Sequence, residues 1–257
     1  MRLLILLLSF FITSTCFACE CVMMPLVYHV QKSDFIAKVK VLKVSEPTVD
    51  GQYQDAQIEI LELFKGKKIS TIRVWANLKT DCDLNVSENS TWLIFAQTNN
   101  SGFLRFDLCS GSLQLDRNFK SREYPNAQNN WTKRIERKLS VLRYLKSNHL
   151  TAPNEYDLAL ESIEKKYEDL RGYSVLKDKF SVFQITVEKN LSISKVKALK
   201  EFDNKALSDS LLSYLKVNKK VNSHKVSGIK KRTKLIIIYY YYDADEKNKS
   251  FISRNDL

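Results

Sequence analysis

Alternating and uninterrupted apolar stretches in the first half of the chain predict a series of β-strands. Residues 35–44 alternate between apolar and polar positions, as expected of a half-buried strand. Similar patterns lie at 56–64, 69–76 and 103–108, and residues 92–96 are wholly apolar, as in a buried central strand. Turn residues such as Pro47 and Gly51 separate the strands. Strands at this regular spacing predict a small barrel or sandwich.

The pattern changes to helical spacing beyond the strands. One helix is predicted to end near Asn148, and its apolar positions are Trp131, Ile135, Leu139, Leu142 and Leu145. Residues 151–154 break the chain, and Asn154 can cap a second helix. The apolar positions of that second helix are Leu158, Ile163, Tyr167 and Leu170. We interpret the two helices as a connector that packs on one or both flanking domains.

The last third of the chain predicts a β-β-α-β unit. Strands are expected at 180–187, 191–199 and 234–242, with an amphipathic helix at 203–216. The fold class is therefore α+β, with two domains. The predicted division is a signal peptide at 1–18, a β-rich domain (barrel or sandwich) at 19–128, a helical connector at 129–171 and the ββαβ domain at 172–257.

The first residues predict export. Met1 and Arg2 give a short positive start, an apolar run follows to Ile12, and small residues precede a cut after Ala18. A retained membrane anchor is the alternative, although the run is short for a bilayer. We find no other stretch long and apolar enough to cross a membrane. The mature protein is expected to be secreted or periplasmic, in the cell envelope.

Four cysteines remain after cleavage: Cys19, Cys21, Cys82 and Cys109. An even number in an exported chain predicts two disulfides, with three pairings open, although Cys19 and Cys21 lie too close in sequence to bond easily. A structural zinc site is the competing interpretation, but it usually needs paired cysteine knuckles. Acylation of Cys19 is another, but Cys16 occupies the position where such signals usually have leucine.

Charge and chemistry narrow the function. The chain has a formal net charge of +12, and the interval between Asp209 and Asp243 contains no acid. Its basic residues are Lys216, Lys219, Lys220, Lys225, Lys230, Lys231, Arg232 and Lys234. This basic patch favours an anionic partner or membrane surface; a solvated protein surface is the alternative, and no nucleic-acid partner is expected.

Catalytic signals are poor. No phosphate-binding glycine loop, nucleophile elbow or zinc-protease motif occurs, and His29, His149 and His224 lie in three separate segments. We therefore expect no catalytic residues, no cofactor and no bound metal, and a binding protein rather than an enzyme. An unrecognised hydrolase is the third hypothesis, and it would require an acid-and-histidine pocket that sequence alone does not reveal.

The first half of the chain resembles a known family. The features are a mature start at Cys19-Glu20-Cys21, the strand that begins at Phe35, Leu63-Phe64-Lys65-Gly66, Cys82, the apolar strand at 92–96, and Cys109-Ser110-Gly111. Together they are similar to the N-terminal domain of tissue inhibitors of metalloproteinases (TIMPs), a netrin-like OB barrel, over residues 19–115. The resemblance implies the disulfides Cys19–Cys82 and Cys21–Cys109.

The same resemblance implies an inhibitory mechanism. In the family, the amine and carbonyl of the first cysteine chelate the zinc of a target metalloprotease, and Cys19 is the matching position. Glu20 stands where the family has a small or hydroxyl residue that enters the specificity pocket of the protease. A carboxylate there needs a polar or basic pocket, because desolvating it is costly.

The last unit resembles the C-terminal domain of TonB-type energy transducers. The similar features are the two strands at 180–187 and 191–199, the helix at 203–216 and the final strand, with Asn190 in place of the usual turn glycine. This likeness implies the fold and an envelope setting, without energy transduction. The alternative function is therefore a cell-envelope protein-interaction module that inhibits no protease.

Overall fold

The protein is α+β in a computed structural model, as the sequence predicts. The structure describes residues 21–22, 24–78, 80–120, 125–151, 154–160, 168–217, 220–223, 225–246 and 248–255. The helices are α2 (Leu26–Lys32), α3 (Ala127–Ser147) and α4 (Lys205–Val217), with a 3-10 turn η2 (Glu168–Leu170). The signal peptide predicted at 1–18 lies outside the described residues.

Five strands close into a mixed β-barrel. They are β1 (Phe35–Val44), β2 (Tyr53–Lys65), β3 (Thr71–Trp75), β4 (Thr91–Thr98) and β5 (Leu104–Phe106). The order is β1-β2-β3-β5-β4, with β4 pairing back to β1, and β6 (Leu113–Gln114) adds to β4. Only the β3–β5 pairing among these is parallel. The predicted strands are confirmed, and the choice between barrel and sandwich is settled for the barrel.

The two faces of β1 and β4 enter different cores. Side chains such as Phe35, Val39 and Ile94 fill the barrel. Their neighbours Ile36 and Phe95 point outward into a second apolar cluster. This explains why residues 92–96 are wholly apolar, because both faces of the strand are buried.

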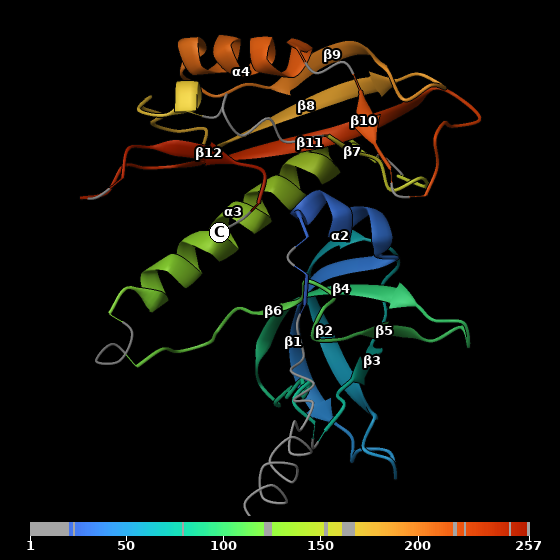
Figure 1. Ribbon diagram of the computed structural model, residues 1–257. Coiled ribbons are helices and arrows are strands. Elements are labelled where there is room, and N and C mark those ends of the chain that lie inside the picture. Colours follow the sequence, from blue (N-terminus) through green and yellow to red (C-terminus); the bar gives the residue numbers. More distant parts are fainter. Residues whose placement is uncertain are drawn as a thin grey trace, which may run out of the picture.

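The C-terminal unit is a four-stranded antiparallel sheet with the order β12-β11-β8-β9. Its strands are β8 (Phe180–Val187), β9 (Ile193–Lys200), β11 (Thr233–Tyr242) and β12 (Phe251–Ser253), and α4 covers one face (Figure 1). The predicted β-β-α-β order is confirmed. The sequence prediction missed β12 and a short pair, β7 (Ala159–Leu160) with β10 (Val221–Asn222).

Helix α3 joins the barrel to this sheet. In Figure 1 it runs beneath the sheet, on the face opposite α4. Leu142 and Leu145 are buried in a core that also contains Phe95 of the barrel and Ile238 of the sheet. Arg143 pairs with Glu62 of β2, at 2.9 and 2.7 Å. The predicted helix is confirmed, and its packing on both halves fits the connector interpretation.

The second predicted helix is wrong at its start. The side chain of Asn154 accepts a hydrogen bond from the backbone N–H of Leu158 and donates one to its carbonyl, both at 2.8 Å. Asn154 therefore closes a loop instead of capping a helix, and the chain continues into strand β7. Leu158 and Leu170 are buried, while Ile163 and Tyr167 lie outside the described residues.

Helix α2 had no counterpart in the prediction. It is seven residues long, and Pro25 precedes it without a capping side chain. Leu26 is the one residue of the helix that exposes less than a tenth of its surface. Such a short segment carries too few apolar positions to show a helical period. It matters because it lies between the barrel and β11 (Figure 1).

The shared core makes a prediction about cooperativity. Replacing Leu142 with Ala should lower the free energy of unfolding by about 2–5 kcal/mol, because it opens a cavity in the cluster between barrel and sheet. Urea unfolding of the Leu142 variant should still show one transition by tryptophan fluorescence and by circular dichroism. Ser140→Ala, on the exposed face of the same helix, should change stability by less than about 0.5 kcal/mol. Two separate transitions in the Leu142 variant would contradict a shared core.

Candidate functional site

A disulfide fixes the start of the described chain to one end of the barrel. Cys21 and Cys109 are bonded, with their Cα atoms 5.2 Å apart, across 88 residues of sequence. In the chain-entropy treatment, closing a loop of this length stabilises the fold by about 4–5 kcal/mol. This pairing confirms the Cys21–Cys109 bond that the family resemblance implies.

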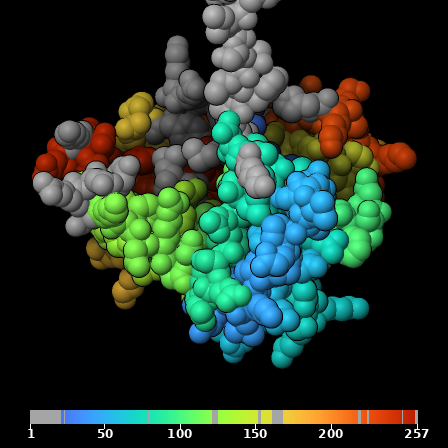
Figure 2. All heavy atoms as spheres, turned by 90° about the horizontal axis from the view of Figure 1, so that it is seen from below, coloured from blue at the N-terminus to red at the C-terminus, as the bar shows by residue number. Residues whose placement is uncertain are grey.

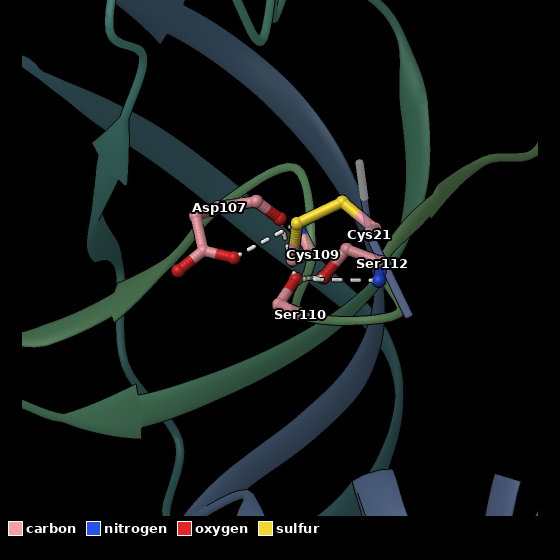
Figure 3. Close-up of a disulfide and its surroundings, with 5 residues drawn as sticks. All are labelled: Cys21, Asp107, Cys109, Ser110 and Ser112. Carbon is pink, nitrogen blue, oxygen red and sulfur yellow. Dashed lines mark hydrogen bonds between the residues drawn. A yellow bond between two sulfur atoms is a disulfide. The ribbon is translucent and has the colours of Figure 1, made fainter. Parts of the chain in front are cut away.

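The loop that carries Cys109 is held by short polar bonds (Figure 3). The backbone N–H of Cys109 donates to the carboxylate of Asp107 at 2.9 Å, and the hydroxyl of Ser110 donates to the Asp107 carbonyl at 2.7 Å. Ser112 Oγ lies 2.8 Å from Ser110 Oγ and accepts from the N–H of Phe95 in β4, also at 2.8 Å. The bonded cysteine is therefore attached to a central strand of the barrel.

His29 forms a second connection beside the disulfide. Its ring packs on Gly111, where a Cβ atom would lie only 2.7 Å from ring atoms of the histidine, and on the ring of Phe95. Gly111 has φ of +84°, so this position excludes a side chain on both backbone and steric grounds. His29 also hydrogen-bonds the backbone of Ser110 and Met24. Helix α2 is thereby fixed to the Cys109 loop.

Burial controls the protonation of His29. Desolvation, with a smaller contribution from the charge of Lys138, lowers the pKa of His29 to about 4, although the backbone hydrogen bonds act in the opposite direction. The imidazole is therefore neutral at physiological pH. Along the sequence His29 is one of three scattered histidines, and the structure gives it a packing role. His149 follows α3 on the surface, and His224 lies outside the described residues.

Apolar side chains are exposed on both sides of the disulfide. Val22, which follows Cys21, exposes 78% of its surface, and Leu108, which precedes Cys109, exposes 38%. Met24, three residues after Cys21, exposes 37%. Single exposed apolar residues are common on proteins, but a group around one rigid feature is typical of an interaction surface. We call Cys21, Val22, Met24, Leu108 and Cys109 the disulfide edge.

The other predicted cysteines are placed only in part. Cys82 is disulfide-bonded, and its backbone N–H donates to Thr80 Oγ1 at 3.1 Å. Cys19, its implied partner, and Glu20, the implied pocket residue, lie outside the described residues. Within the ranges that the structure describes, no three His, Cys, Asp or Glu side chains are grouped to hold a metal ion. No helix in those ranges is long and apolar enough to cross a membrane.

Only some of the basic residues between Asp209 and Asp243 lie together at one end of the C-terminal sheet. Arg232 pairs with Glu188 of the β8–β9 turn, Ile229 donates to the carbonyl of Lys189 at 2.8 Å, and Lys220 bridges to Ser192. Lys230 and Lys231 directly precede Arg232 and are exposed, and Lys234 of β11 pairs with Thr186 of β8. We call Lys189, Lys220, Lys230, Lys231, Arg232 and Lys234 the β8–β9 basic end. Lys219 lies outside the described residues, and Lys216 lies in the last turn of α4.

Two basic residues outside the interval 209–243, Lys189 and Lys195, lie near the same end of the sheet. Lys195 of β9 is aligned with Thr186 of β8, which in turn pairs with Lys234 of β11, so Lys195 shares their cross-strand row. Lys189 belongs to the turn itself. Lys225, in contrast, is paired with Asp157. Charge counted along the sequence does not group Lys189 and Lys195 with the interval, because the sheet places β8 and β9 beside residues some forty positions later.

The molecule seen from below presents the barrel, with α3 beside it and parts of the C-terminal unit emerging on both sides (Figure 2). The sequence matches no protein-family model and no curated protein. The disulfide edge and the β8–β9 basic end are the two surfaces of the described residues that bear on function.

The buried histidine predicts a pH dependence of stability. Between pH 6.5 and about 4 the unfolded chain binds a proton at His29 that the folded chain does not, so stability is lost as the pH falls through this window. Between pH 7 and pH 5 the loss should be about 2 kcal/mol. Urea unfolding of His29→Gln should lack this part of the pH dependence. The matched variant His149→Gln, at an exposed position, should retain it, and equal slopes in all three proteins would contradict the assignment.

Proposed function

We propose that the chain is an exported TIMP-like protein that inhibits a zinc metalloprotease through the amine of Cys19. The observation that carries the proposal is the disulfide edge, in which each bonded cysteine has an exposed apolar neighbour, Val22 or Leu108. A rigid, apolar surface next to a chain terminus is what a protease cleft can bind. The barrel supports the same proposal, because the strand order β1-β2-β3-β5-β4 suits a netrin-like OB class.

Covalent geometry limits where the proposed amine can lie. Cleavage after Ala18 places it two residues before Cys21, and consecutive Cα atoms are about 3.8 Å apart. The amine would thus remain within roughly 8 Å of the disulfide edge. Cys82 is disulfide-bonded, and with Cys19 as its partner this bond would fix the terminal residue as well. A tethered terminus loses little conformational entropy on binding.

The chemistry of the amine fits zinc. A neutral α-amine and the adjacent carbonyl can form a five-membered chelate at the open coordination position of a catalytic zinc. The pKa of an ordinary α-amine is about 8, so a substantial neutral fraction exists at physiological pH. Glu20 would then face the specificity pocket, which selects for proteases whose pocket is polar or basic.

Inhibition assays on the mature chain test this function. Protein beginning at Cys19, with the free amine and two disulfides verified by mass, should inhibit at least one enzyme of a zinc-metalloprotease panel. Adding one alanine before Cys19 displaces the amine and should weaken inhibition by at least ~30-fold, as expected when a contact worth 2 kcal/mol or more is lost. The extended protein should unfold at the same urea concentration as the mature one.

A second substitution separates the role of the pocket residue. Glu20→Thr should extend inhibition to proteases with apolar or neutral pockets, because it removes the carboxylate that must be desolvated. The proposal fails if the mature protein with an uncapped Cys19 inhibits nothing on the panel. It fails equally if the alanine-extended protein inhibits as strongly as the mature form.

The β8–β9 basic end favours a second candidate function, a cell-envelope interaction module with a TonB-like C-terminal unit. Its cations gather on one end of the sheet, with Glu188 as the acid that pairs Arg232. The order β8, β9, α4 and β11 along the chain supports the likeness to the TonB C-terminal domain. An electrostatic partner surface of this kind should be sensitive to salt.

Charge reversal tests the second candidate. The triple variant Lys230→Glu, Lys231→Glu and Lys234→Glu should lose most partner recovery from envelope extract at low salt, and wild type should lose it at about 0.5 M salt, where screening shortens the range of the field. The matched control reverses Lys43, Lys67 and Lys68, three exposed lysines of the barrel, and should recover partners as wild type does. Equal recovery by both triple variants would remove the basic end from the function.

A further inference from the structure

An apolar cavity of about 370 Å³ lies where α2, β7 and β11 meet. Its walls include Leu26 and Val27 of α2, Leu158 and Leu160 at β7, and Ile236 and Ile238 of β11. These three segments are far apart in sequence and come together between the barrel and the C-terminal sheet (Figure 1). Junctions between domains are frequent locations of ligand pockets, and this volume lies within the usual range for small molecules.

The cavity follows the edge of β11. Leu235, Ile236, Ile237 and Ile238 all line it, although successive side chains of a strand point to opposite faces. Both faces can border one cavity only where that cavity runs along the strand edge. Among the described residues β12 pairs with β11 only at Tyr240–Tyr242, so it does not cover this stretch. Four residues span about 13 Å, which gives the cavity an elongated wall.

One of the lining residues carries a buried donor without an acceptor. Gln31 lines the cavity, and its side-chain Nε2 is shielded from solvent with no hydrogen-bond partner. Leaving such a group unsatisfied is destabilising, since its hydrogen bonds to water are lost on folding. A ligand oxygen would accept from this Nε2 once the Gln31 side chain turns toward the cavity, and that bond would remove the cost.

The charges around the cavity are predominantly positive. Asp157, the one acid among the described lining residues, pairs with Lys32 at 2.9 Å and also with Lys225. Arg254 is a second lining cation beside Lys225, and its guanidinium donates to the carbonyl of Leu160 at 2.7 Å. Gln31 precedes Lys32 in α2, so the unsatisfied donor lies in the same helix as one partner of Asp157. One carboxylate against two lining cations favours an anionic ligand group.

We propose that this cavity binds a saturated fatty carboxylate along the edge of β11. The aliphatic chain would contact the apolar walls, and the carboxylate would accept a hydrogen bond from Gln31 near Lys225 and Arg254. A methylene group is similar in size to a water molecule, whose share of liquid volume is about 30 Å³, so the cavity suits a chain on the order of ten carbons. This site is separate from the disulfide edge and does not depend on protease inhibition.

Calorimetric titration of the mature protein with decanoate and dodecanoate tests the proposal. We expect saturable binding of one molecule per chain, a rise in melting temperature of a few degrees at saturating ligand, and at least fivefold weaker binding of decanol, which lacks the charge. Gln31→Leu should weaken decanoate binding about tenfold, because one hydrogen bond to a charged group is lost. It should leave decanol binding within about twofold.

Filling the cavity provides the decisive comparison. Ile238→Trp should abolish binding of both ligands, and Leu160→Phe serves the same purpose if the tryptophan variant does not fold. Val49→Trp, at a fully exposed position of the barrel, should bind as wild type does and controls for adsorption to a new aromatic surface. The proposal is overturned if decanoate shows no saturable binding, if decanol binds equally well, or if a folded filled variant binds as wild type does.

Discussion

The apolar cluster between barrel, α3 and the C-terminal sheet is the contact on which the rest of the molecule depends. It takes the outward face of β1 and β4, one face of α3 and one face of β8 and β11. On that side neither the barrel nor the sheet is exposed to solvent, so each would expose a broad apolar surface if the two were separated. The cluster therefore sets the position of α2 against β11, and with it the cavity that the two segments enclose.

This constraint also explains which elements a linear reading could find. Residues 92–96 and 235–242 stand out as uninterrupted apolar runs because each segment is buried on two faces, and the helix around Leu142 stands out because a single stripe is buried. Short elements such as α2, β7 and β12 have two to seven residues and lack a measurable period. Their existence depends on partners distant in sequence, which no local pattern reports.

The candidate sites divide in the same way. The Cys21–Cys109 bond was accessible because a resemblance supplied a pairing that spacing alone left open. The packing of His29 on Gly111, and the unsatisfied amide of Gln31, are products of tertiary structure with no sequence signature. Asn154 shows the opposite error: a good capping residue was predicted to begin a helix, but its side chain bonds Leu158 and closes a loop. The sequence indicates correctly that the Asn154 side chain bonds nearby backbone groups, but these bonds close a loop and do not begin a helix.

The covalent ring closed by Cys21 and Cys109 has one more consequence. It encloses nearly the whole barrel, including the exposed turn around Val49. Cleavage of a peptide bond in that turn produces two polypeptides that stay linked through sulfur, and the strands on either side of the cut remain paired as β1 and β2. The chain can thus be nicked in this turn without shedding a fragment, and damage of this kind would be visible by electrophoresis only after reduction.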